Sequence, residues 1–193
     1  MRKILLSLLF LFTATTSFAT ENKMSNEHPK VKLTTSLGDI VIQLNHEKAP
    51  ISSENFLTYV NEGFYNGTLF HRVIKDFMAQ GGGFDTSFKQ KATHTEIQNE
   101  ADNGLKNTRG SIAMARTNMP HSASAQFFIN YKDNSFLNHT GKNASGWGYA
   151  VFGEVIEGME IVDKMATEPT GSRNGYQDVP KTDIVIEKAE LIK

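Results

Sequence analysis

Two segments of this chain, residues 70–82 and 126–128, hold the side chains best suited to chemistry. They combine Arg72, which stays charged at any physiological pH, with the amides of Gln80 and Gln126 and with several large apolar side chains. They contain no nucleophile–base pair, no cluster of metal ligands and no phosphate loop. A surface of this kind suits a substrate that is held and twisted rather than cut.

The rest of the chain offers no stronger site. Its six histidines share no metal-ligand spacing. Ser111, Ser122 and Ser124 lack the Gly-x-Ser-x-Gly setting of a hydrolase nucleophile. Residues 81–83 are glycines, but no Gly-Lys-Ser or Gly-Lys-Thr follows them as in a phosphate loop. We therefore expect no metal ion and no cofactor.

The alternation of side chains along a strand predicts which residues share a face. Met78 and Gln80 point to one side of their strand, and Gln126 and Phe128 to one side of theirs, so Phe127 must point into the interior. Burial of Met78 and the phenylalanines in an ordinary core is the alternative, but glutamine is rarely fully buried. The apolar residues that are candidates for lining a pocket beside the amides are Phe77, Met78, Phe128 and Leu137.

The hydrophobic pattern predicts the elements that position these residues. A helix begins at Pro50 and stops at Gly63, and a second helix covers residues 158–167. Residues 84–109 form a long polar stretch with little periodicity. Strands are predicted at residues 31–35, 39–44, 68–74, 77–80, 111–115, 126–131, 149–152 and 183–192. This pattern indicates a mainly β fold. We expect a closed eight-stranded antiparallel β-barrel that is capped by two α-helices.

Length and composition indicate one ordinary soluble domain. The chain has 193 residues, of which 39% are hydrophobic and 21% charged. Its formal net charge of −1 gives no reason to expect nucleic-acid binding. The chain has no cysteine, which excludes disulfides and thiolate chemistry.

The N-terminus has the layout of a secretory signal peptide. Arg2 and Lys3 precede an apolar run at residues 4–12, and small residues precede a cleavage site after Ala19. The alternative is an uncleaved anchor, but the run is short for the ~20 residues that span a bilayer. We expect a signal peptide at residues 1–19, a flexible lead-in at 20–30 and one domain at 31–193. The mature protein would be periplasmic, without stable membrane insertion.

Four sequence blocks, at residues 70–74, 77–82, 126–130 and 149–153, resemble the cyclophilin family of peptidyl-prolyl cis–trans isomerases. They occur in the family's order and spacing, and the resemblance extends from about Val31 to Ile192. Asn107 to Gly110 looks like the bacterial branch. The resemblance implies a cyclophilin-like barrel, without cofactor and monomeric. It also implies an isomerase that rotates X-Pro bonds in unfolded or extended polypeptides and assists protein folding.

The resemblance also assigns roles to individual residues. Arg72 matches the catalytic arginine, whose guanidinium can donate a hydrogen bond to the proline nitrogen only when the amide is twisted. Ala115, Arg116 and Thr117 match a strand edge that holds the substrate largely through backbone groups. The residues that match the family's binding pocket are Phe77, Met78, Gln80, Gln126, Phe128 and Leu137, with Phe136 and Tyr149 at positions that vary.

The chain departs from the eukaryotic pattern at several of these positions. Phe136 replaces a tryptophan, Tyr149 a histidine and Arg116 an asparagine, while Gly83 stands where aspartate is common. Phenylalanine lacks the indole N–H donor, so we expect weak cyclosporin binding. Two other functions stay open at this point: a non-catalytic module that binds proline peptides on the same barrel, and a chaperone whose client binding ignores proline.

Overall fold

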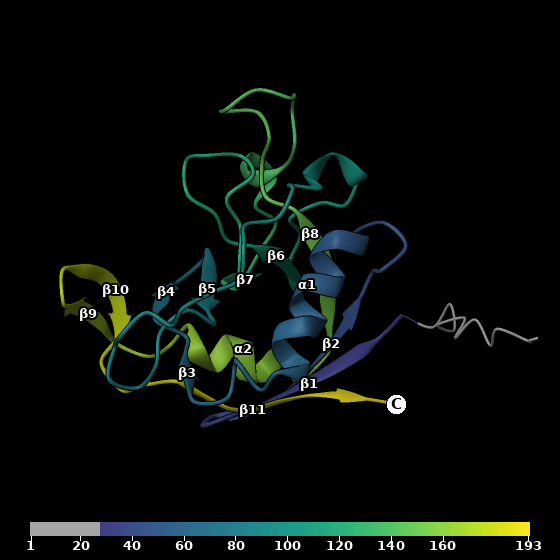
Figure 1. The fold of residues 1–193 in the computed structure, drawn as a ribbon. Coiled ribbons are helices and arrows are strands. Elements are labelled where there is room, and N and C mark those ends of the chain that lie inside the picture. The colour runs from purple at the N-terminus through teal and green to yellow at the C-terminus, as the bar shows by residue number, and fades with distance from the viewer. Residues whose placement is uncertain (1–27) are drawn as a thin grey trace, which may run out of the picture.

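The computed structural model describes residues 28–193 (Figure 1). The predicted signal peptide and the lead-in up to residue 27 lie outside the described residues. The first strand, β1 (Lys30–Thr35), begins one residue before the predicted position and pairs with β2 (Gly38–Leu44) as a hairpin. Leu33 and Ile40 face each other across this hairpin and are completely buried, because alternate residues of both strands point into the core.

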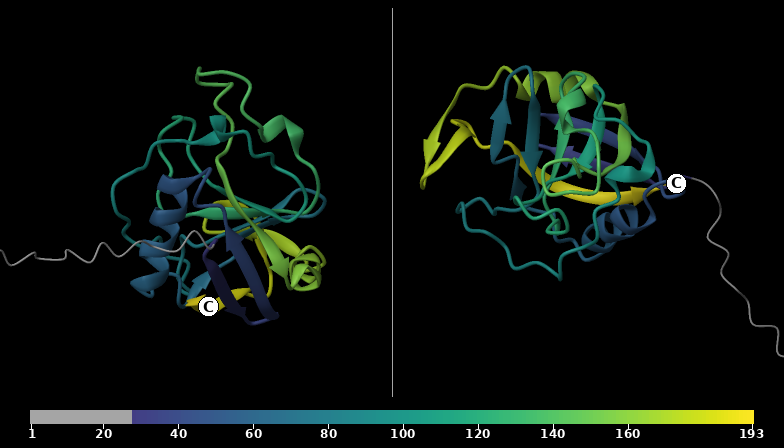
Figure 2. Two further views of the ribbon diagram at one scale, coloured as in Figure 1. Left: turned by 90° about the vertical axis from the view of Figure 1, so that its right-hand side faces the viewer. Right: turned by 90° about the horizontal axis from the view of Figure 1, so that it is seen from above.

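A curled antiparallel sheet of nine strands forms the body of the molecule (Figures 1 and 2). Its order is β3-β11-β1-β2-β8-β6-β7-β5-β4, while β9 and β10 form a separate hairpin. The remaining strands are β3 (Thr68–Leu69), β4 (Arg72–Ile74), β5 (Met78–Gly81), β6 (Ser111–Met114), β7 (Phe127–Asn130), β8 (Val151–Glu157), β9 (Thr170–Arg173), β10 (Tyr176–Pro180) and β11 (Val185–Ile192).

Two α-helices pack against this sheet, as predicted. Helix α1 (Pro50–Asn61) starts with a proline in its first turn and buries Phe56, whose ring meets Phe127 edge-on at 5.4 Å. Helix α2 (Met159–Met165) follows Gly158, which has a left-handed φ of 82°. Short 3₁₀ turns lie at Ala101–Asn103 and Ser135–Leu137. Within residues 28–193, no helix is long and apolar enough to cross a membrane.

The mainly β class is confirmed, but the described part of the chain has more strands than the eight predicted. The predicted strand at residues 68–74 is divided, because the chain leaves its ladder at Phe70 and passes from one edge of the sheet to the other. Leu69 N–H donates to Phe84 O at 2.9 Å and Gly82 N–H to Leu69 O at 3.2 Å, which connects β3 to the segment that follows β5. Closure into a complete barrel stays a prediction.

The hairpin of β9 and β10 was not predicted. Its turn is Asn174-Gly175, with φ values of 50° and 84°. An Asn-Gly pair is the usual sequence for a tight hairpin turn because both positions need positive φ. The signal was present in the sequence, but the flanking strands are short and polar and show no apolar alternation.

His71 sits at the crossing between β3 and β4. Its side chain is buried, its ring lies 4.6 Å from that of Phe84, and its Nδ1 has no hydrogen-bond partner among the described residues. Burial lowers the pKa of His71 from 6.5 to about 4, and the nearby charge of Arg72 acts in the same direction. The folded protein therefore holds this imidazole neutral.

We expect His71 to make the fold less stable in mild acid. Between pH 6.5 and 4 the unfolded chain binds a proton at His71 that the folded chain does not, so this residue's contribution falls as the pH falls. The free energy of unfolding should drop by on the order of 3 kcal/mol across this window. Urea denaturation at pH 7 and pH 4.5 measures it. In His71→Gln the pH dependence should be smaller by most of that amount, and an unchanged dependence would contradict this assignment.

Candidate active site

Direct cross-strand pairing aligns the central site residues. Arg72 on β4 lies opposite Gln80 on β5, which lies opposite Phe128 on β7. Residues directly opposed in antiparallel strands share a face, so these three side chains form a row across the outside of the sheet. Their neighbour Phe127 belongs to the interior core. The prediction that Phe127 points inward is confirmed.

A second apolar cluster, separate from the interior core, lies on this outer face. The predicted pocket residues Met78, Phe128 and Leu137 are buried in it, and Phe77 and Tyr149 are partly buried against it. Phe136 stacks on Phe77 with ring centroids 5.6 Å apart but is 72% exposed. The cluster thus has a buried floor and an exposed aromatic rim. Its other members, which were not among the predicted site residues, are Ile74, Leu105, Ala113 and Val151.

The two predicted amides contact each other. Gln80 Nε2 donates to Gln126 Oε1 at 2.9 Å. A Cβ placed on Gly83 would lie 2.5 Å from the Gln126 side chain, so the glycine leaves the space that Gln126 occupies. The hydrogen bond holds the Gln126 amide beside Gln80, and so beside the row of Arg72, Gln80 and Phe128.

Arg72 is half exposed above this face and forms an ion pair that sequence reasoning had missed. Its Nε lies 3.5 Å from Asp178 Oδ2, and the two side chains are 44% and 40% exposed. Within residues 28–193 no hydrogen bond engages the terminal guanidinium nitrogens. A guanidinium carries five N–H groups, so donors stay available on the side away from the carboxylate.

The segment Ala115–Thr117 borders the cluster, and part of its backbone is already bonded. The N–H of Ala115 donates to Gln126 O at 2.9 Å and that of Thr117 to Ser122 Oγ at 3.0 Å. Arg116 Nε donates to Gly148 O at 2.9 Å, and its guanidinium carbon lies 4.5 Å from the centroid of the Tyr149 ring. Backbone binding of a substrate at this edge is therefore limited to the groups that these bonds leave.

Buried asparagines hold the walls of the cluster in place. Asn134 Nδ2 donates to Phe77 O at 3.0 Å and to Asn130 Oδ1 at 2.8 Å, and Asn130 Nδ2 donates to Ser111 Oγ at 2.9 Å. These bonds tie the turn before β5 to β7, β6 and the 3₁₀ turn that carries Phe136 and Leu137. The sequence gives no local signal for the bonds to Phe77 and Ser111, because these partners are 57 and 19 residues away along the chain.

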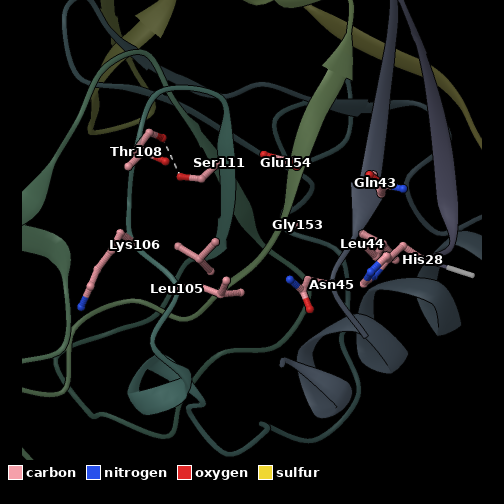
Figure 3. Close-up of a pocket in the computed structure, with 11 residues that line it drawn as sticks. His28, Gln43, Leu44, Asn45, Leu105, Lys106, Thr108, Ser111, Gly153 and Glu154 are labelled. Atoms are coloured by element: carbon pink, nitrogen blue, oxygen red, sulfur yellow. Dashed lines mark hydrogen bonds between the residues drawn. The ribbon is translucent and has the colours of Figure 1, made fainter. Parts of the chain in front are cut away.

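A different cavity, of about 220 Å³, lies beside β2 and β8 (Figure 3). It adjoins the outer cluster through Leu105 and Val151, but none of the predicted site residues lines it. Its lining mixes apolar groups with polar side chains such as Asn45, Lys106 and Glu154. The candidate active site is therefore the open surface around Arg72, and not this more enclosed hollow.

Comparison with known proteins identifies the family of this chain. The family model described as cyclophilin type peptidyl-prolyl cis-trans isomerase matches residues 30–191. Peptidyl-prolyl cis-trans isomerase cyp18 of Streptomyces antibioticus is 60% identical over 162 residues, which cover 84% of this chain and 98% of the relative. Peptidyl-prolyl cis-trans isomerase B of Escherichia coli is 59% identical over 157 residues, covering 81% and 96%.

A solved structure has the same architecture. The crystal structure of a cyclophilin type peptidyl-prolyl cis-trans isomerase from Cryptosporidium parvum in the presence of the dipeptide Ala-Pro aligns with a TM-score of 0.68 and 28% identity. The alignment covers 85% of this chain and 99% of that chain. The resemblance read from four sequence blocks is confirmed, and the chain belongs to the cyclophilin-type peptidyl-prolyl cis-trans isomerases.

Proposed function

We propose that this isomerase rotates X-Pro bonds in unfolded or extended polypeptides by stabilising the twisted amide with Arg72 above the outer apolar cluster. The observation that carries this proposal is the cross-strand row of Arg72, Gln80 and Phe128. It combines a cation with free donors, a bonded amide pair and an apolar surface on one face. No cofactor enters this mechanism.

The energetic requirement is modest enough for non-covalent contacts. Resonance gives the X-Pro bond a rotation barrier of about 18–20 kcal/mol. Bringing exchange from tens of seconds to milliseconds requires lowering that barrier by roughly 5–7 kcal/mol. A site can reach this by gripping the proline ring, excluding water and stabilising the twisted form more than either planar form.

Arg72 can supply the preference for the twisted form. In a planar amide the proline nitrogen shares its lone pair with the carbonyl and accepts no hydrogen bond. In the twisted state the lone pair is localised, and a charged N–H donor interacts with it strongly. The terminal nitrogens of Arg72 are suited to this role because Asp178 lies on the Nε side.

The outer apolar cluster can bind the proline ring of the substrate. Phe77 and Phe136 offer exposed aromatic surface next to the buried side chains of Met78, Phe128 and Leu137. The ring of proline is small and apolar, so contact with these groups removes it from water. The Cryptosporidium parvum relative, crystallised in the presence of Ala-Pro, supports a proline-containing ligand for this chain too.

We further propose that the enzyme acts as a periplasmic monomer that assists the folding of exported proteins. The support for export is the order of charged, apolar and small residues over positions 1–19 of the sequence. Exported polypeptides present X-Pro bonds before they fold, and slow isomerisation of those bonds can limit folding rates.

Loss of the guanidinium should remove most of the catalysis while leaving substrate binding intact. For Arg72→Ala we expect kcat/KM on a prolyl peptide to fall about 100-fold, the usual loss for one transition-state donor. A protease-coupled assay measures the rate, and NMR titration measures peptide affinity. Arg109→Ala is the matched control, since Arg109 pairs with Asp163 at 2.8 Å and has a similarly exposed side chain. Equal rates in wild type and Arg72→Ala would refute the role of Arg72.

The same assay separates the alternative functions. A non-catalytic binding module would bind the prolyl peptide without accelerating its isomerisation. A chaperone that ignores proline would bind a peptide equally well after its proline is replaced by alanine. Acceleration that depends on both Arg72 and the proline excludes both alternatives.

Phe136 should make cyclosporin a weak inhibitor. Wild type is expected to need far more than nanomolar inhibitor, because the exposed phenylalanine offers no N–H donor. Phe136→Trp adds that donor, and the inhibition constant should improve about tenfold, as one hydrogen bond allows. Phe136→Leu, which adds no hydrogen-bond donor, serves as the control. Nanomolar inhibition of the wild type would show that Phe136 is not the residue that sets this response.

Signal cleavage is tested by the mass of the secreted protein. Expression of the full chain in a bacterial host should give a periplasmic product that begins at Thr20. Ala19→Leu puts a large residue at the cleavage position and should leave the uncleaved precursor. A full-length wild-type product held in the membrane would contradict the proposed export.

A further inference from the structure

The hairpin of β9 and β10 carries a carboxylate to the edge of the candidate active site. It packs beside β4, which holds Arg72 (Figures 1 and 2). In the described part of the chain, Asp178 provides the one carboxylate within ion-pair distance of Arg72, with its Oδ2 3.5 Å from Nε. Neither the family motifs nor the alternation of strand residues identified Asp178.

A β-bulge directs Asp178 toward Arg72. Tyr176 pairs with Arg173 and Val179 pairs with Gly171, so β10 has one more residue than β9 between these two pairs. Asp178 lies in this extra stretch and has a left-handed φ of 61°. Bulges change the direction of a side chain, and left-handed conformations of residues other than glycine persist where the surrounding structure imposes them.

The hairpin that carries the bulge is firmly anchored. Arg173 Nη1 lies 2.8 Å from Asp183 Oδ1, and Tyr176 packs edge-on against Phe84 and Phe88 at 5.1 and 5.6 Å. Within the hairpin, Ser172 Oγ donates to Gln177 Oε1 at 2.7 Å. These contacts therefore set the backbone position from which the Asp178 side chain extends toward Arg72.

We propose that Asp178 is a positioning residue that orients the Arg72 guanidinium for catalysis. Arg72 has a long, half-exposed side chain with many rotamers, and a donor aimed at the proline nitrogen must hold one of them. A fixed carboxylate on the Nε side restricts the guanidinium plane and leaves the terminal N–H groups directed at the substrate. This inference rests on the catalytic role proposed for Arg72.

Because the ion pair of Arg72 and Asp178 is exposed, we expect its loss to affect catalysis rather than stability. Exposed ion pairs contribute little to stability, so Asp178 has no large structural role through this contact. Small errors in the placement of a catalytic group are costly to the rate. Asp178 should therefore change kcat while leaving thermal stability and peptide affinity almost unchanged.

Two substitutions at this position separate charge from backbone effects. Asp178→Gly removes the carboxylate and suits the left-handed φ, and Asp178→Asn keeps an acceptor oxygen without the charge. We expect kcat to fall about 10-fold in Asp178→Gly and about 3-fold in Asp178→Asn, since one misplaced donor costs this much or more. Asn174→Gly is the matched control, because Asn174 also has positive φ but lies in the turn of the same hairpin.

A double-mutant cycle tests whether Asp178 acts through Arg72. In the Arg72→Ala background, Asp178→Gly should cause no further loss of kcat. A further loss of the same size, wild-type kcat in Asp178→Gly, or a rise in kcat would each overturn the inference. These results differ from failure of the proposed function, which would appear as wild-type activity in Arg72→Ala alone. A loss of kcat with an equal loss in Asn174→Gly would instead assign the effect to the hairpin backbone and also overturn the inference.

Discussion

The register between β4, β5 and β7 is the constraint on which the site depends. The pairing of Arg72 with Gln80, and of Gln80 with Phe128, puts a cation, an amide and an aromatic ring on the outer face. The same pairing directs Val73, Ala79 and Phe127 into the interior core. A shift of the register by one residue would exchange these two sets of side chains. It would bury the guanidinium of Arg72 and expose Phe127. The burial of the inner set therefore fixes the location of the outer set, and the core selects the active-site geometry.

Glycines at residues 81–83 make this register compatible with close packing. Gly82 has a φ of 79° and approaches Tyr65 and Phe127, and a Cβ there would lie 2.8 Å from the Tyr65 ring. Gly83 leaves room for the side chain of Gln126, which in turn accepts the hydrogen bond from Gln80. Three consecutive glycines resemble a ligand loop in the sequence, but here they allow the chain to pass close to its neighbours. Gly82 admits core side chains and Gly83 admits Gln126 of the site.

The alternation of side chains along the sequence was sufficient to predict residue orientation where a strand is regular. The period of two placed Phe127 inside and Met78 and Gln80 together, because these strands are regular. The period of two failed at residues 68–74, because the chain crosses there between the two edges of the sheet. Apolar residues therefore occur at both odd and even positions of this segment, and Leu69, Phe70 and Val73 are all buried. The period of two also could not find Asp178, since a bulge and a positive φ break the alternation. The bond from Asn134 to Phe77 O could not be predicted for another reason: Phe77 is 57 residues away along the chain, and only the fold brings the two residues together.

Rigidity follows from the chemistry proposed for the site. Catalysis requires a contact that is stronger with the twisted amide than with the planar one. A mobile donor must first lose rotamer freedom to make that contact, which weakens its net effect. The buried bonds of Asn134 to Phe77 O and Asn130 Oδ1 hold the apolar walls, so substrate binding does not have to order them. Arg72 extends from this frame on a long, half-exposed side chain, so its orientation needs a second contact. The fold provides a carboxylate at that point, on a hairpin that is itself anchored away from the pocket.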